Sequence, residues 1–189
     1  MEMQKIAITV LFSMLLGAAA SQLPFVPTSA FAKVEPAAAV APKSDIKAYF
    51  SPNGGCTDAI VAQLDAAKVS VDVQAYSFTS APIAKAVVDA KDRGVKVRVI
   101  LDKSQETEKY SSLTFLHNAG VPTWVDHKHA IAHNKIMIID GKTLLTGSFN
   151  FTKNAEKSNA ENLLVINGQP ELIVEYEKNF EKHLAHSDE

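Results

Sequence analysis

Hydrophobic and polar residues change their spacing along the chain in a way that predicts alternating strands and helices. Short apolar or β-branched stretches predict strands at 46–50, 71–76, 95–101, 121–125, 135–139, 143–146 and 162–166. Apolar residues at helical spacing predict helices starting near Thr57 or Asp58, after Ser80 and at Ser112, and an amphipathic helix from Pro170 to about His186. The pattern indicates an α/β domain with a mixed β-sheet flanked by helices. The strands at 71–76 and 95–101, joined by a helix, are expected to be parallel.

The strands predicted at 135–139 and 143–146 are separated by Asp140-Gly141, a strong hairpin signal. A turn at Asp140-Gly141 would place His133 opposite Ser148. A turn one residue later would place Lys135 opposite Ser148 and His133 opposite Asn150. Either register brings four polar residues to one end of the hairpin, namely His133, Lys135, Ser148 and Asn150.

These residue types suit a phosphodiester group. Lys135 offers an ammonium donor, Ser148 and Asn150 offer neutral donors, and Gly147 lets the backbone approach closely. Such donors stabilise the charge on the phosphoryl oxygens in the transition state. A histidine attacks phosphorus effectively when a carboxylate holds its second nitrogen. The candidates for that carboxylate are Asp140 and Glu161.

No cluster of metal-ligating residues accompanies this set, so we expect no metal and no cofactor. His127-Lys128-His129 resembles a metal-binding tract, but we find no carboxylate or cysteine partner at ligand spacing. We interpret the tract as a substrate-facing or surface loop.

Composition and charge limit the alternatives. The 189 residues, 47% of them hydrophobic, suit one globular domain. The net charge of -2 gives no bulk attraction to nucleic acid, so binding of a polyanion depends on local lysines. The loops at 103–111 and 125–132 supply Lys103, Lys109 and Lys128, although neighbouring Glu106 and Glu108 weaken any basic patch. The single cysteine, Cys56, is interpreted as a small buried residue.

The first 32 residues differ in composition from the rest. Lys5 precedes an apolar run at 6–20, and Ala30-Phe31-Ala32 matches an A-x-A cleavage site, which together predict a secretory signal peptide cleaved after Ala32. The run is short for a membrane span, so no stable anchor is expected after cleavage. Residues 33–44 are rich in Ala and Pro and predict a flexible linker, which leaves 45–189 as the catalytic domain of a periplasmic or secreted protein.

The stretch HNKIMIIDGKTLLTGSFNFT resembles the HxKxxxxDxxxxxxGSxN motif of the phospholipase D superfamily. Every spaced position is filled, by His133, Lys135, Asp140, Gly147, Ser148 and Asn150. The similarity extends over about 48–184 and includes VDVQAYSF at 71–78 and Glu161-Asn162. Most phospholipases of this superfamily carry two copies of the motif, whereas this chain has one copy. The short, single-copy, exported form resembles the bacterial nucleases of the family.

The resemblance implies a phospholipase D-like fold and a metal-independent phosphodiesterase. Single-copy members pair as homodimers and share an active site. By resemblance, His133 attacks phosphorus and forms a phosphohistidine, while the partner's His133 protonates the leaving oxygen and then activates water. Lys135 and Asn150 would bind the phosphate, with Ser148 in support. Glu161 would orient the nucleophile, and Asp140 is more often structural than directly chemical.

Three functions fit these residues: a nuclease acting on DNA and also on RNA, a lipid phosphodiesterase of the phospholipase D type, and a non-catalytic phosphate-binding module. Size, the single motif and the expected export favour the nuclease. A lipase is expected to expose an apolar loop near the site, whereas the loops here are mostly polar. The intact His133 argues against a non-catalytic module.

Overall fold

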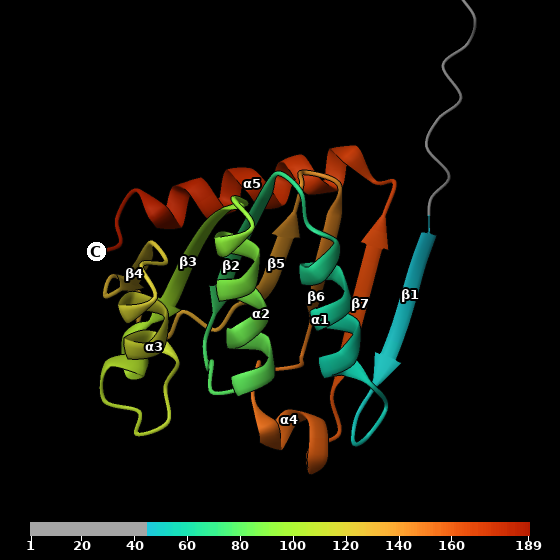
Figure 1. Ribbon diagram of the computed structural model, residues 1–189, viewed down its shortest axis with the longest axis horizontal. Coiled ribbons are helices and arrows are strands. Elements are labelled where there is room, and N and C mark those ends of the chain that lie inside the picture. The colour runs from blue at the N-terminus through green and yellow to red at the C-terminus, as the bar shows by residue number, and fades with distance from the viewer. Residues whose placement is uncertain (1–44) are drawn as a thin grey trace, which may run out of the picture. The chain divides into compact units, whose positions relative to one another are not determined.

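The computed structural model describes residues 45–189, which form a seven-stranded mixed β-sheet with helices on both faces (Figure 1). The strand order is β1-β7-β6-β5-β2-β3-β4. The strands are β1 Asp45–Phe50, β2 Ser70–Ala75, β3 Lys96–Asp102, β4 Thr123–Asp126, β5 Lys135–Ile139, β6 Thr143–Gly147 and β7 Asn162–Asn167. The helices are α1 Cys56–Ala66, α2 Ala81–Asp92, α3 Leu113–Asn118, α4 Lys153–Lys157 and α5 Pro170–Leu184, with a 3-10 helix at Lys103–Glu106. The predicted α/β class is confirmed.

The predicted signal peptide and linker, residues 1–44, lie outside the described residues. Within 45–189, no helix combines the length and the apolar character needed to cross a membrane.

Different helices cover the two faces of the sheet (Figure 1). Helices α1 and α2 pack on one face, where Ile60 and Val87 join a core with Val73 of β2. Helix α5 crosses the other face, where Ile173 and Phe180 pack in a second core. Burial of apolar area on both faces supplies the main driving force for this three-layer arrangement.

The connection between β2 and β3 follows the sequence prediction. The two strands are parallel, with Val73 opposite Val99, and helix α2 forms the crossover between them. Strand β4 extends the parallel part, whereas β5, β6, β7 and β1 are antiparallel to their neighbours.

The β5–β6 hairpin has neither of the two predicted registers. Ile139 pairs with Thr143, which leaves a three-residue loop at 140–142. Asp140 and Gly141 both have positive φ angles, 54° and 60°, a conformation that Asp and Gly tolerate better than most residues. One further step along both strands from the pair Ile136–Thr146 places Lys135 opposite Gly147. Each of the two predicted registers differs from the observed one by a single residue. His133, Lys135, Ser148 and Asn150 therefore still lie toward the same end of the hairpin.

The start of helix α1 also differs from its prediction. The helix begins at Cys56 rather than at a Thr57 or Asp58 cap. The backbone N–H groups at the start of the helix, which have no partner within the helix, are capped by a residue far away in the sequence. The Glu156 carboxylate accepts hydrogen bonds from Gly55 N (3.2 Å) and Thr57 N (2.7 Å). Glu156 belongs to α4, a short helix that the hydrophobic spacing did not predict. Cys56 is fully buried, as predicted, and burial together with Glu156 raises its pKa to about 11.

Candidate active site

The two halves of the motif meet beside the segment that follows β2. Tyr76 N donates to the carbonyl oxygen of Asn134, which lies between His133 and Lys135. A few residues later, Thr79 N and Ser80 N both donate to the carbonyl oxygen of Phe151, the residue after Asn150. One segment, residues 76–80, thus fixes the backbone on both sides of the site, and it overlaps the end of the VDVQAYSF stretch at 71–78 on which the family resemblance partly rests.

Lys135 is the buried cation of the site, with 7% of its surface exposed. Its Nζ donates to the carbonyl oxygen of His133 at 2.9 Å and lies 5.1 Å from the centre of the Tyr76 ring. Burial lowers the pKa of Lys135, and the negative charge of Glu161 opposes that shift. The ammonium group is therefore held in place and incompletely solvated, which strengthens its attraction for a phosphoryl oxygen.

His133 is exposed and has a ring neighbour. Its imidazole lies 4.6 Å from the Tyr76 ring, centre to centre, with an angle of 52° between the rings. Within the part of the chain that the structure describes, the His133 imidazole forms no hydrogen bond. A solvent-accessible imidazole with an unengaged nitrogen is suited to attack an incoming phosphorus atom.

No hydrogen bond joins Glu161 to His133 among the described residues, so the orienting role that the family resemblance implies stays a prediction. The Glu161 carboxylate accepts a hydrogen bond from Asn159 Nδ2 at 3.0 Å, and its backbone exchanges hydrogen bonds with Ser51. Glu161 does act on Lys135, through the electrostatic effect on its pKa. The geometry therefore places Glu161 in the same charged environment without a direct link to the imidazole.

Ser148 and Gly147 are joined to Asn162, at the start of β7. The Ser148 hydroxyl oxygen accepts hydrogen bonds from Asn162 N (3.1 Å) and Asn162 Nδ2 (3.3 Å), which leaves its own hydrogen available for donation. Gly147 has a φ of 153°, and a Cβ there would lie 2.3 Å from the carbonyl oxygen of Asn162. A glycine is required because the two strands approach each other too closely for any side chain.

Asn150 carries an unsatisfied polar atom. Its Oδ1 is buried and has no hydrogen-bond partner among residues 45–189. A buried amide without a partner is costly in a folded protein, and such groups occur preferentially at functional sites. This oxygen is an acceptor and so does not itself bind a phosphate, whereas the Nδ2 group of the same amide can donate to a phosphoryl oxygen, and through it Asn150 remains a candidate for binding the substrate.

Asp140 lies at the other end of β5 from His133, so the structure does not bring this member of the predicted catalytic set to the other motif residues. Its carboxylate accepts hydrogen bonds from three backbone N–H groups, those of Lys68, Val69 and Ser70, at 2.7 to 3.1 Å. Burial would raise the pKa of Asp140, but these backbone donors outweigh it and lower the pKa. Since the whole of strand β5 separates Asp140 from His133, its role in this chain is to fix the hairpin turn to the start of β2.

A groove of about 430 Å³ opens beside the motif. His133 and Lys135 line it together with Glu175, Tyr176 and Asn179 of helix α5. Helix α5 therefore forms part of the wall of this groove.

The sequence analysis did not assign roles to Tyr76 and Asn162. Tyr76 contacts both His133 and Lys135, and Asn162 holds Ser148. Both residues lie in segments that the resemblance included, but their partners are distant in sequence.

Of the three loop lysines, Lys103 donates through Nζ to the carbonyl oxygen of His129 and Lys109 lies 5.3 Å from the Tyr110 ring centre. Lys103 is therefore engaged within the protein.

The prediction that His127-Lys128-His129 has no carboxylate partner at ligand spacing is wrong. His129 Nδ1 lies 2.9 Å from a carboxylate oxygen of Asp126, only three residues earlier, a partner that the search for ligand spacing passed over. His183 and His186 approach the same carboxylate from the C-terminal end of the chain. Sequence spacing could not predict that His183 and His186 lie beside Asp126, because more than 50 residues separate Asp126 from either histidine.

Comparisons with known proteins identify the family of the chain. The family model described as cardiolipin synthase, PLD-like domain, matches residues 60–184. A protein named phospholipase D from Rickettsia conorii is 44% identical over 138 residues, which cover 73% of this chain and 68% of the relative. A mitochondrial cardiolipin hydrolase from Chlamydomonas reinhardtii is 34% identical and covers 63% of this chain and 53% of the relative.

Two solved structures resemble the fold closely. Nuc from Salmonella typhimurium, a phospholipase D family member, is 35% identical with a TM-score of 0.73, and the match covers 77% of this chain and 97% of Nuc. NucT from Helicobacter pylori is 26% identical with a TM-score of 0.71, and the match covers 77% of this chain and 99% of NucT. With a family model that matches residues 60–184, a relative that is 44% identical and a fold shared with these solved structures, the chain belongs to the phospholipase D superfamily and is a phosphodiesterase.

Proposed function

We propose that the protein is a metal-independent nuclease that hydrolyses the phosphodiester bonds of DNA, and also of RNA, in an active site shared by two subunits. The observation that carries the proposal is the pairing of an exposed imidazole, that of His133, with a buried ammonium group, that of Lys135. The first supplies a nucleophile, and the second stabilises the charge on the phosphoryl oxygens.

The reaction has two displacements at phosphorus. An imidazole nitrogen of His133 forms a bond to phosphorus, the bond to the leaving oxygen breaks, and the partner's His133 gives a proton to that oxygen. The partner's His133 then removes a proton from water, whose oxygen bonds to phosphorus while the nitrogen–phosphorus bond breaks. Lys135 and Asn150 bind the phosphate in both steps, with Ser148 donating its remaining hydrogen.

A second subunit is part of the proposal because the two steps need an acid and a nucleophile. His133 is the one histidine among the residues lining the groove. The exposed apolar side chain of Ile131, 58% exposed, lies two residues before His133 and is available to an adjoining subunit. Export through residues 1–32, with 33–44 as linker, completes the proposal for a periplasmic or secreted enzyme.

Nucleic acid is preferred as the substrate on the strength of Nuc and NucT, because the match covers almost the whole length of both chains. A lipid phosphodiesterase is the second candidate. The Rickettsia relatives named phospholipase D favour it, as does the exposed Ile131, an apolar residue of the kind that a lipase would present near its site.

A comparison of substrates tests the proposal. The purified protein is incubated in excess chelator with plasmid DNA, RNA and phosphatidylcholine vesicles, alongside His133→Ala and a control variant, His117→Ala, whose residue lies in helix α3. We expect cleavage of nucleic acid that His133→Ala abolishes and His117→Ala retains. Release of head groups with intact nucleic acid would favour the lipid candidate. Loss of activity that a divalent ion restores, in protein whose circular dichroism and thermal unfolding the chelator leaves unchanged, would contradict metal-independent chemistry.

A further inference from the structure

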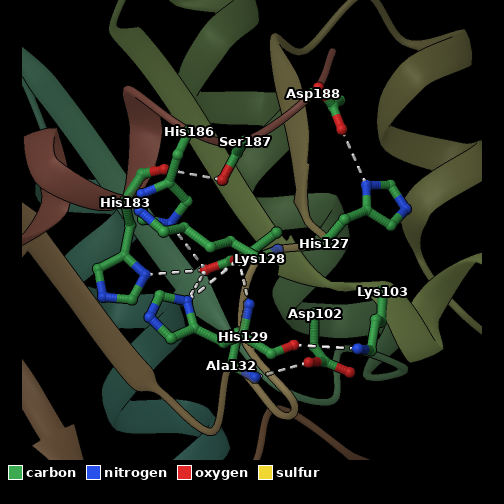
Figure 2. Close-up of polar contacts among 11 residues, drawn as sticks. Asp102, Lys103, His127, Lys128, His129, Ala132, His183, His186, Ser187 and Asp188 are labelled. Carbon is green, nitrogen blue, oxygen red and sulfur yellow. Dashed lines mark hydrogen bonds and ion pairs between the residues drawn. The ribbon is translucent and has the colours of Figure 1, made fainter.

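Four potential metal ligands gather at the end of the sheet where β4 meets the C-terminal end of α5 (Figure 2). Asp126 is the last residue of β4, and His129 lies in the loop that follows. His183 lies in the last turn of α5, and His186 lies two residues after the end of that helix. One ligand atom from each residue lies within 4.8 Å of the others. Figure 2 shows the three imidazole rings turned toward one another, and their centres are 4.8 to 5.3 Å apart.

The Asp126 carboxylate is buried and fixed in orientation. Its Oδ1 accepts hydrogen bonds from the backbone N–H groups of Lys128 (3.0 Å) and His129 (3.2 Å). Its Oδ2 faces nitrogens of all three histidines, at 2.9 Å for His129, 2.9 Å for His183 and 3.4 Å for His186. The carboxylate side chain is 0% exposed, and the side chains of His183 and His186 are only 12% and 16% exposed.

Hydrogen bonding alone accounts poorly for this convergence. A carboxylate oxygen has two lone pairs, whereas three imidazole nitrogens face Oδ2. Burying a carboxylate among three aromatic rings also costs free energy unless its charge is neutralised. A cation at the centre would satisfy the carboxylate and all three nitrogens.

We propose that Asp126, His129, His183 and His186 form a binding site for a divalent transition metal ion, with zinc as the best match. Three imidazole nitrogens and one carboxylate oxygen are a donor set that zinc accepts in tetrahedral geometry. Zinc bonds of about 2.0–2.1 Å place neighbouring ligand atoms about 3.3 Å apart. The oxygen–nitrogen distances of 2.9 to 3.4 Å match this spacing, whereas the four ligand atoms together lie within 4.8 Å of one another, so the imidazole nitrogens must move closer together when the ion binds. Binding requires that each facing nitrogen release its proton to solvent or carry it on the other ring nitrogen.

The site has a structural role, since it lies outside the residues that line the groove. It joins the end of α5 to the loop that leads from β4 to His133, with His129 only four residues before the nucleophile. The same loop is held by Lys103 Nζ on His129 O and by Ala132 N on Asp102 Oδ2 (Figure 2). A bound metal would add a cross-link between two segments that are far apart in sequence, and so would stabilise the folded state.

Titration of the untagged, chelator-stripped full-length protein with zinc sulfate tests this inference. We expect one zinc per chain by calorimetry, and a rise of about 5–10 °C in the midpoint of thermal unfolding at a hundredfold excess over Kd. Cobalt(II) in place of zinc should give the visible absorption bands of a four-coordinate site.

Two variants locate the site, and one serves as a control. His183→Gln and His186→Gln should each weaken zinc binding at least tenfold, as measured on samples whose circular dichroism shows a folded protein, while His117→Gln binds as the wild type does. Absence of saturable binding, or equal affinity in all four proteins, would overturn the proposal and leave a hydrogen-bonded cluster only. These experiments measure zinc binding and thermal unfolding rather than phosphodiesterase activity, so the outcome for the metal site is independent of the outcome for the proposed function.

Discussion

Lys135 donates through its ammonium group to the backbone carbonyl oxygen of His133, at 2.9 Å. The two residues that define the motif are thus linked by a hydrogen bond as well as by their spacing. The contact holds the buried cation beside the backbone of His133, the proposed nucleophile, and the Tyr76 ring contacts both side chains. The cation and the nucleophile are therefore positioned together before any substrate binds.

Replacing the cation should damage catalysis more than stability. Lys135→Gln removes the charge that faces the phosphate, so we expect kcat/KM to fall by about 10²–10³-fold. Lys142→Gln, at the exposed turn of the same hairpin, is the matched control and should keep wild-type activity. Steady-state kinetics on a defined oligonucleotide measures the effect. A Lys135→Gln enzyme within threefold of the wild type would show that Lys135 does not bind the transition state.

Glu161 should set the alkaline limit of activity. Its negative charge raises the pKa of Lys135 against the lowering effect of burial, so its removal should lower that pKa further. The protonated form of Lys135 is then lost at lower pH. We expect Glu161→Gln to move the alkaline limb of the kcat/KM profile to lower pH, whereas Glu171→Gln, in the first turn of α5, leaves it in place. An unchanged alkaline limb in Glu161→Gln would contradict the coupling.

Most of this fold could be predicted from the spacing of apolar residues, because strands and amphipathic helices each place their buried residues at a characteristic spacing along the sequence. The hairpin register was missed by one residue, since Asp140-Gly141 fits a two-residue turn as well as the three-residue loop that forms. The motif residues were identified by spacing. Contacts between distant segments, such as Glu156 with the start of α1 and Asp126 with His183, have no local signal and required the structure.

Asp140 should contribute to stability rather than to chemistry. Asp140→Asn keeps a residue that tolerates the positive φ but removes the charge that three backbone N–H groups face, and we expect a loss of about 1–2 kcal/mol in the free energy of unfolding. The pKa of Asp140 is lower in the folded state than in the unfolded chain, so its contribution is present above about pH 4 and disappears as pH falls through the folded pKa. Urea unfolding of both proteins at several pH values checks this. A difference that persists undiminished at low pH would contradict the assignment.

Gly147 should be intolerant of any side chain. A Cβ in Gly147→Ala would lie 2.3 Å from the carbonyl oxygen of Asn162, so β6 and β7 must separate. We expect a loss of about 1–3 kcal/mol in stability and a fall in activity as Ser148 moves. Gly94→Ala is the control, because Gly94 also has a positive φ, 89°, but open space around its Cβ position. Equal destabilisation of the two variants in thermal unfolding would show that strain in φ, and not the close approach, governs Gly147.

The central claim is that one active site needs His133 from each of two chains. Co-expression of wild-type and His133→Ala chains with two different tags allows the mixed dimer to be purified, and its rate of DNA cleavage in chelator can be compared with that of the wild-type dimer. Because the mixed dimer lacks either the nucleophile or the acid, we predict a rate at least about 100-fold below the wild type. A mixed dimer with half the wild-type rate, or an active protein that sediments as a monomer, would contradict the shared site.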